Sequence, residues 1–390
     1  MQGQPARLVW AASGFAALVL GLMLAGAMGR AVGHAMAAGA FYGIIDFNTM
    51  WQAGALLRGG GVAVLYDRHL FDAWLQLHDG GRYADESWLY TPPMGLFAAG
   101  LSYLPLPFSF WFWRVAMLLA STAILRRAGL GWWVIAAGLL GPAEVYDFAT
   151  GQNGTLTAGL LVGALLMAET RPVVSGWLGG CLLIKPQIGI LLPAAFLQRR
   201  LWRVCLTAAA SILLLAASAT IMQGGRAWWD FCLLAQPNAG RILAIPFGGV
   251  FQRAGFTVFL MARSFGLGLR AAWAVQLLCS LAAMLGVWRL WRAPTGAPVA
   301  RMALTVCASM LAMPYGFSYD LVSLSIAVAA LVPGAKAWEA PVLALLWLWP
   351  GFTSVITVTT GFVLMPFAAL IGMALALCRL RRFDRCRGFT

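Results

Sequence analysis

The chain has 390 residues, of which 61% are hydrophobic and only 10% are charged, and its mean hydropathy is +0.81. A soluble globular protein carries about 25% charged residues, because its surface must face water. The composition therefore excludes an ordinary soluble enzyme and indicates a polytopic membrane protein. A net charge of +14 would also fit a nucleic-acid-binding protein, but the placement of the arginines argues against that class.

The arginines gather in short breaks between apolar runs, at 126–127, 199–203, 289–292 and 379–387. Basic residues are enriched in the cytoplasmic loops of membrane proteins, so these breaks are predicted to be cytoplasmic, and no nucleic acid is expected as a partner. The seven cysteines are scattered without a Cys-x-x-Cys pair. Neither a disulfide framework nor a thiolate metal site is indicated.

The first apolar run, Leu8–Met28, is long enough to cross a bilayer as a helix. One arginine precedes it and further spans follow, so we interpret it as a retained anchor rather than a cleaved signal. Residues Gly29–Tyr90 are then predicted to form a long first outer loop, which holds six of the thirteen acidic residues and all three histidines. Within this loop, Met50–Leu57 and His69–Leu77 mix apolar and polar residues as short surface helices do.

The middle of the chain consists of apolar segments punctuated by proline. They are Met94–Leu104, Phe108–Leu125, Trp132–Val145, Thr155–Ala168, Val173–Ile184 and Ile188–Leu197. Several are too short to cross a bilayer alone, so we expect tilted, broken or re-entrant helices. If the basic breaks on either side of it are cytoplasmic, the turn Gly151–Asn153 faces outward.

Three later runs approach or exceed the length of a span: Val204–Met222, Ala271–Trp288 and Val355–Cys378. Residues 223–253 are predicted to form a second outer loop. Phe256–Leu267 is predicted to be re-entrant or a surface helix, because another crossing would place the basic break at 289–292 outside. Together the runs predict an all-α polytopic membrane protein with about 10–13 transmembrane or re-entrant helices, organised as one domain over residues 1–390.

The chain contains no P-loop, dinucleotide fingerprint, HExxH motif or nucleophile elbow. The chemical candidates are therefore polar groups near the outer surface, where an unused charge is costly. Asp46, a lone acid soon after the first span, is either a helix cap or a catalytic base. Lys185, one of two lysines, is either a residue that snorkels at a helix end or a phosphate ligand, and Pro186 after it should break the helix and expose backbone donors.

Other polar residues have similar pairs of interpretations. Gln152 and Asn153 are turn residues or sugar ligands, and Arg241 in the second outer loop is solvated or contacts phosphate or acceptor. Asp320 either caps the next helix or joins the site. Glu144 could supply a second carboxylate, although a structural partner to an arginine is the better interpretation, and the same holds for Asp147.

Four short motifs follow one another in an order that resembles glycosyltransferase family 87. They are Asp46-Phe47 with Trp51-Gln52-Ala53, Leu57-Arg58-Gly59-Gly60 and Leu65-Tyr66-Asp67; Tyr90-Thr91-Pro92-Pro93; Gly151-Gln152-Asn153; and Ile184-Lys185-Pro186 followed by Arg199-Arg200-Leu201-Trp202. The third motif departs slightly from the family's Gly-Gln-x-Asn turn, since Asn here follows Gln directly. The likeness covers residues 40–205 well and the remainder only as hydropathy.

This family belongs to the C-type glycosyltransferases, which are polytopic. The resemblance implies an inverting enzyme that moves a hexose, most commonly mannose, from a polyprenyl-phosphate donor to a glycan or glycolipid acceptor. The expected location is the bacterial inner membrane with the site on the periplasmic side, and membrane lipids are its surroundings. Asp46 would be the catalytic base. The expected substrate-binding residues are Tyr90, Gln152, Asn153, Lys185, Arg241, Tyr319 and Asp320. No metal or other cofactor is expected, because Lys or Arg can hold the departing phosphate.

Two functions from other classes fit part of the pattern. A transporter or flippase for a lipid-linked glycan would explain broken helices and intramembrane charge. Against it, no repeat relates the two halves of the chain, and the acids concentrate in one outer loop. A non-catalytic assembly subunit would fit the hydropathy but leaves Asp46 and Lys185 unexplained.

Overall fold

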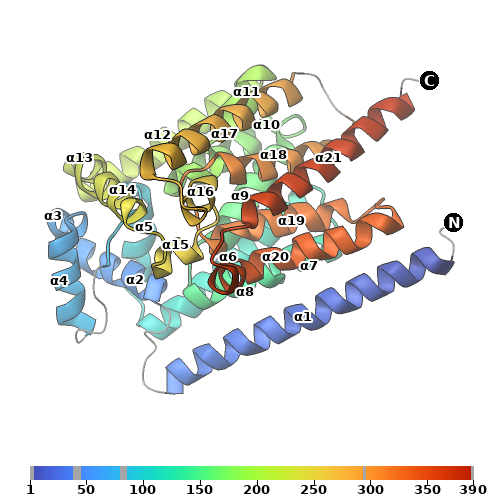
Figure 1. Ribbon diagram of the computed structural model, residues 1–390. Helices are drawn as coiled ribbons and strands as arrows, with labels where there is room; N and C mark the ends of the chain where they lie inside the picture. Colours follow the sequence, from blue (N-terminus) through green and yellow to red (C-terminus); the bar gives the residue numbers. More distant parts are fainter. Residues whose placement is uncertain (1–3, 38–44, 80–85, 293–295, 388–390) are drawn as a thin grey trace.

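The computed structural model describes residues 4–37, 45–79, 86–292 and 296–387, and these ranges form helices without a β-sheet (Figure 1). Five helices are long and apolar enough to cross a membrane. They are α1 (Gln4–Ala37), α6 (Leu106–Arg127), α12 (Trp202–Gln223), α17 (Leu269–Leu290) and α20 (Ala340–Thr360). Only 11% of the crossing segment of α1 and 39% of that of α6 is buried. Because such exposed apolar surface is stable only against lipid, the chain is an integral membrane protein.

The interior is made of shorter helices that are buried on nearly every side. These are α9 (Gly154–Met167), α18 (Pro298–Ala312) and α19 (Val322–Leu331). α9 packs against α6, α10 (Pro172–Cys181), α18 and α19. A helix that is apolar all round must be enclosed by other helices or by lipid, and here the other helices enclose it.

Further helices complete the bundle around this interior. They are α5 (Pro92–Leu101), α7 (Trp132–Leu139), α8 (Pro142–Thr150), α11 (Leu192–Gln198), α16 (Val258–Ser264) and α21 (Met365–Arg387). The described residues contain five candidate spans and five shorter apolar helices of 10–17 residues. The predicted total of 10–13 transmembrane or re-entrant helices stays a prediction.

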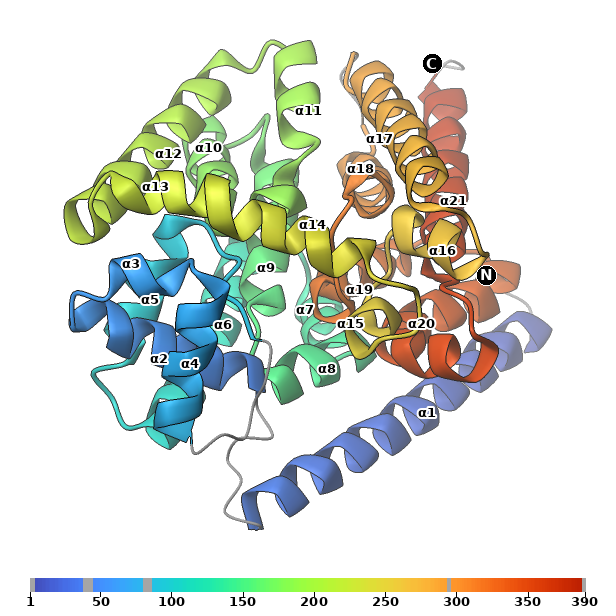
Figure 2. The same cartoon turned by 60° about the vertical axis from the view of Figure 1, so that its left-hand side comes forward.

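Short helices lie across one end of the bundle, while the two chain termini lie at the other end (Figure 1). They are α2 (Ile45–Arg58), α3 (Val62–Leu65), α4 (Arg68–Asp79), α13 (Arg226–Asp230), α14 (Gln236–Ala244) and α15 (Val250–Ala254). Figure 2 shows α13 and α14 as one continuous stretch that passes alongside α2–α5. A π-helical turn at 231–235 joins these two helices.

Several predicted boundaries are wrong. The first helix continues to Ala37, so residues 29–37 are helical rather than the start of a loop. The predicted run Trp132–Val145 is divided, because α7 ends at Leu139 and α8 begins at Pro142. The run Val355–Cys378 is also two helices, since α20 ends at Thr360 and the next residue, Gly361, has a φ of 80° in the left-handed region.

The predicted surface helices differ from each other in burial. α4 is amphipathic as predicted, with Phe71 buried and Leu77 exposed. α2 is helical, but it packs against α5 with Phe47, Met50 and other apolar side chains buried, so it does not lie free on the membrane surface. α16 has seven residues, about 10 Å at 1.5 Å per residue, and is too short to cross, which agrees with the prediction for Phe256–Leu267.

Small residues allow α2 to approach α5. An ideal Cβ on Gly54 would lie 1.9 Å from the carbonyl oxygen of Ala98, whereas a Cβ on Gly100 of α5 would meet nothing within 4 Å. The close crossing fixes the position of α2, which carries Asp46 in its first turn.

We therefore expect Gly54→Ala to lower the thermal unfolding midpoint of the detergent-solubilised protein, because overpacking costs about 1–3 kcal/mol. Gly100→Ala is the matched control and should leave the midpoint unchanged or raise it slightly, because alanine is the better helix former. Equal midpoints for the two variants would show that the α2–α5 crossing is looser than the structure indicates.

Candidate active site

The helical conformation is interrupted at Lys185. A 3₁₀ turn at 182–184 follows α10, Lys185 takes an extended conformation with φ −151° and ψ 72°, and a second 3₁₀ turn begins at Pro186. Proline cannot continue the preceding helix, which accounts for the break. Thr91 Oγ1 donates a hydrogen bond of 2.6 Å to the carbonyl of Leu183 and holds the first turn in place.

Lys185 forms a buried ion pair. Its Nζ lies 2.5 Å from Oδ1 of Asp320 and donates to Oδ1 of Asn153 at 3.3 Å. Nζ also lies 4.5 Å from the ring centroid of Tyr319. Lys185 is only 5% exposed, so its side chain does not snorkel to the surface. The sequence-predicted residues Lys185, Asn153, Tyr319 and Asp320 are thus brought together.

Asp320 has two structural tasks. Its Oδ2 accepts a hydrogen bond of 3.1 Å from the backbone N–H of Phe317, and this bond closes the turn before α19. Its Oδ1 pairs with Lys185. The two interpretations of Asp320, cap and site residue, are therefore compatible in this fold.

The turn Gly151–Asn153 lies beside the ion pair. Gly151 has φ 69°, a left-handed conformation that ends α8 and that glycine adopts without strain. A Cβ on Gly154 would lie 1.9 Å from the carbonyl oxygen of Tyr319, so the two turns touch through backbone. The Tyr90 hydroxyl donates to Oε1 of Gln152.

Arg114 of α6 contacts the backbone of the turn Gly151–Asn153. It forms ion pairs with Glu144 and Asp147, the latter at 3.0 Å, and it donates to the backbone carbonyl of Gln152 at 2.9 Å. Asp147 in turn accepts from the N–H of Gly154 at 2.7 Å. The interpretation of both acids as partners of an arginine is confirmed. Arg114 itself was not predicted, although a lone arginine within the apolar run 108–125 was a usable signal.

Asp46 belongs to the same cluster. Burial raises the pKa of Asp46 to about 6. A hydrogen bond from Gln152 and the positive charge of Lys185 lower the pKa, and the negative charge of Asp147 raises it, but burial has the largest effect. A carboxylate with this pKa is mostly ionised at neutral pH and is a stronger base than an ordinary aspartate.

A second carboxyl group, Glu86, was overlooked among the acids of the first loop. Burial raises the pKa of Glu86 to about 7, and the negative charges of Asp46 and Asp72 add to the increase. Its backbone N–H donates to Oδ1 of Asp72 at 3.2 Å. Glu86 therefore lies beside α4, at the start of the irregular segment that leads to Tyr90, and interacts electrostatically with Asp46.

Aromatic rings line the cluster. Tyr146 stacks on Tyr319 with centroids 6.4 Å apart, and Phe317 lies 5.6 Å from Tyr319. The two tyrosines combine a flat apolar face with a hydroxyl group at the edge. Tyr319 thus contacts Lys185, while Tyr146 and Phe317 pack on Tyr319.

Arg241 is exposed on α14. Its Nε donates to Oδ1 of Asn238 at 3.0 Å, and Asn238 donates to the hydroxyl of Ser87 at 2.7 Å. Arg241 is thus connected to the segment that carries Glu86 and Tyr90. Its contact with phosphate or acceptor stays a prediction.

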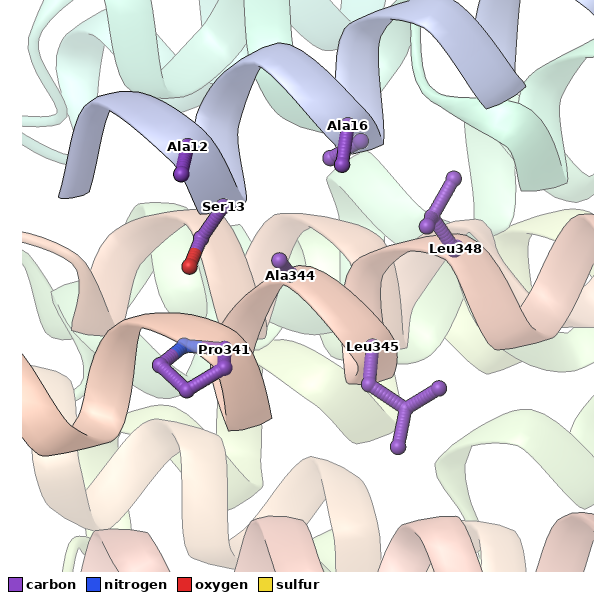
Figure 3. Close-up of a pocket in the computed structure, with 8 residues that line it drawn as sticks. Ala12, Ser13, Ala16, Pro341, Ala344, Leu345 and Leu348 are labelled. Carbon is purple, nitrogen blue, oxygen red and sulfur yellow. The ribbon is translucent and has the colours of Figure 1, made fainter. Parts of the chain in front are cut away.

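A pocket in the bundle is lined mainly by apolar side chains and contains no charged residue. It lies between α1 and α20, has a volume of about 390 Å³ and is lined by small and apolar side chains (Figure 3). Its lining is Ala12, Ser13, Ala16, Ala17, Pro341, Ala344, Leu345 and Leu348. It shares no residue with the Lys185 cluster.

Comparison with known protein families identifies the family of the chain. The profile of Glycosyltransferase family 87 matches residues 88–314, more than half of the chain. The chain belongs to glycosyltransferase family 87. No curated protein and no solved structure gives a significant match.

Family 87 membership makes this chain a membrane glycosyltransferase, and hence an enzyme with a sugar donor and an acceptor. The transporter and assembly-subunit interpretations are thereby set aside. The matched range includes Tyr90, Gln152, Asn153 and Lys185 but neither Asp46 nor Asp320. The fold brings these last two residues to the matched ones.

The buried ion pair predicts a specific pattern of stability. Asp320→Leu should lower the unfolding midpoint strongly, because an unpaired buried charge costs about 3–5 kcal/mol. The double variant Lys185→Met/Asp320→Leu should recover much of that loss, because no charge is left uncompensated. Arg199→Gln, which removes one of two arginines that pair with the part-exposed Glu169, is the control and should change stability by less than about 1 kcal/mol. A double variant no more stable than Asp320→Leu alone would contradict the coupling.

Proposed function

We propose that this family 87 enzyme is an inverting hexosyltransferase that moves mannose from a polyprenyl-phosphate donor to a glycan or glycolipid acceptor. The proposed location is the outer, periplasmic side of the bacterial inner membrane. The observation that carries the proposal is the convergence of a base, a buried cation and neutral hydrogen-bonding groups, from segments distant in sequence, at one end of the bundle.

Lys185 is the proposed partner of the donor phosphate. An ammonium group has three N–H donors, and two of them point to Asp320 and Asn153. The third can donate to a phosphate oxygen as negative charge develops there. Asp320 holds Lys185 in place through the buried ion pair. This route includes no metal and no nucleotide, because the leaving group is a lipid phosphate held by a cation.

Asp46 is the proposed catalytic base. The acceptor oxygen attacks the anomeric carbon as the bond from that carbon to the phosphate oxygen breaks. The hydroxyl proton passes to the Asp46 carboxylate, and polyprenyl phosphate leaves with the bonding electron pair. A single displacement inverts the anomeric centre. Gln152, already in hydrogen-bonding reach of Asp46, and Asn153 are proposed to orient sugar hydroxyls, with Tyr90 and Tyr319 as walls of the site.

The distribution of charge supports the proposed side of the membrane. α9 begins at the site, and just beyond its other end Glu169 pairs with Arg199 of the basic break before α12. The 14 residues of α9 span about 21 Å, so the site and this basic break lie at opposite ends of the bundle. Since basic breaks favour the cytoplasm, the site is proposed to face outward.

Asp46→Asn should abolish most transfer while the protein stays folded. Asn keeps the shape and hydrogen bonding of Asp but cannot accept the proton, so the rate of sugar transfer from a polyprenyl-phosphate donor should fall by about 10²–10⁴. The matched control is Asp67→Asn. Asp67 accepts from the N–H groups of His69 and Leu70 and caps α4, and Asn caps nearly as well. That control should retain full activity.

Two further measurements separate base from cap. With Asp46 intact, the transfer rate should rise with pH up to about 6 and then level off, because the base is active when ionised. A raised pKa means that the contribution of Asp46 to folding stability is full below pH 3.8 and is lost as pH rises through about 6. Asp46→Asn should therefore unfold at an equal or higher temperature at pH 7.5. Near-full transfer by Asp46→Asn would rule out Asp46 as the base.

The orientation can be tested by labelling. In a cysteine-free background, a cysteine at the exposed position His78 should react with a membrane-impermeant maleimide added to intact spheroplasts. A cysteine at the exposed position Arg292 should react only after the membrane is opened. The reverse pattern would place the site on the cytoplasmic face.

A further inference from the structure

The basic end of the bundle contains a pocket that the transfer reaction does not use. It has a volume of about 700 Å³ and is lined by two segments far apart in the sequence. Gln198, Arg199 and Arg200 come from the turn between α11 and α12, and Leu285, Trp288, Arg289 and Arg292 come from the end of α17. Four of the seven lining residues are arginines.

The two segments are held together by Trp291, which is fully buried. Its indole N–H donates to the hydroxyl of Thr305 at 3.0 Å, and its ring meets Phe196 edge to face with centroids 5.9 Å apart. The guanidinium of Arg301 lies 4.0 Å from the same ring. Because α11, α17 and α18 meet at this side chain, the pocket is preformed rather than assembled by its ligand.

The pocket has an excess of positive charge. Arg199 pairs with Glu169 at 2.7 Å, but Glu169 is shared with Arg301, 3.0 Å away. In the part of the chain that the structure describes, no ion pair involves Arg200, Arg289 or Arg292. The charge rule for membrane topology explains why arginines lie on this face, but not why four of them line one concavity.

Arg200 occupies a position that suits glycine. Its N–H bonds to the carbonyl of Leu197 and the N–H of Leu201 to that of Phe196, both at 3.0 Å. These are the two bonds of a Schellman motif, whose left-handed residue is usually glycine. Arg200 has φ 55°, the only positive φ of a non-glycine residue in the described chain. The fold thus accepts a local cost at a residue whose guanidinium lines the pocket.

The wall of the pocket on α17 is apolar and faces lipid. Leu285 and Trp288 are exposed, and Leu281, Leu278 and Leu277 continue the exposed face along the same helix. A ligand that fits both parts has a phosphate for the guanidinium groups and hydrocarbon for the helix face. We propose that this pocket binds the headgroup phosphate of an anionic phospholipid whose acyl chains lie along α17. This inference does not depend on the transfer chemistry.

The test titrates the purified full-length protein in neutral detergent with dioctanoyl phosphatidylglycerol, using tryptophan fluorescence and native mass spectrometry. Wild type should bind this lipid more tightly than dioctanoyl phosphatidylcholine or glycerol phosphate. Arg289→Gln/Arg292→Gln should weaken binding about tenfold or more. The control Arg127→Gln/Arg381→Gln removes the same charge at exposed positions outside the pocket and should bind normally.

Arg200→Gly separates folding from binding. Glycine suits the left-handed position, so this variant should unfold at an equal or higher temperature and yet bind phosphatidylglycerol more weakly. Equal binding of the two lipids would overturn an anion site, and glycerol phosphate binding as tightly as the lipid would overturn a lipid ligand. An equal loss of lipid affinity in the pocket variant and the control variant would show that binding depends on general surface charge, which would overturn a site in this pocket.

Discussion

The ion pair between Lys185 and Asp320 is the constraint around which the site end of the molecule is arranged. Taking both charges out of contact with water costs several kcal/mol, and their attraction offsets this only when hydrogen bonds satisfy the remaining atoms. Here Asn153 accepts from Lys185, and the N–H of Phe317 donates to Asp320. The pair therefore joins three irregular segments, the break after α10, the turn before α9 and the turn before α19, at one point.

A second buried network supports the first one. Arg114 pairs with two acids, and Asp147 accepts from the N–H groups of Gly154 and Thr155 at the start of α9. These N–H groups have no partner within the helix, and the positive end of the helix dipole favours a carboxylate there. Asp147 therefore caps the N-terminus of α9, and the network fixes the backbone conformation of the adjacent residues Gln152 and Asn153.

The sequence predicts the long spans well, because an apolar run of sufficient length has few alternatives in a membrane. α12 and α17 match their predicted runs closely, and Pro186 marks the break at Lys185. Hydropathy cannot register a change of direction inside an apolar run. The left-handed Gly361 therefore divides a stretch that reads as one span.

The composition of the site is harder to predict than its location. Asp46 and Lys185 stand out as isolated charges in apolar stretches, but nothing in their sequence neighbourhood names Asp320 as a partner 135 residues away. Burial is equally hard to predict from the sequence when the covering element is distant in the chain. α2 has the mixed pattern of a surface helix, and only the close approach at Gly54 reveals that α5 covers it.

The segment Tyr90–Pro93 shows why a short motif can identify this architecture. Tyr90 donates to the side chain of Gln152, Thr91 to the carbonyl of Leu183, and the carbonyl of Pro92 accepts from Gln223 at 2.7 Å. Three successive residues thus tie α5 to the turn before α9, to the break at Lys185 and to the end of α12. Prolines at the start of α5 leave no backbone N–H in need of a partner there. The motif connects α5 to these three elements, so the spacing of its residues is set by the distances between the elements rather than by contact with a sugar alone.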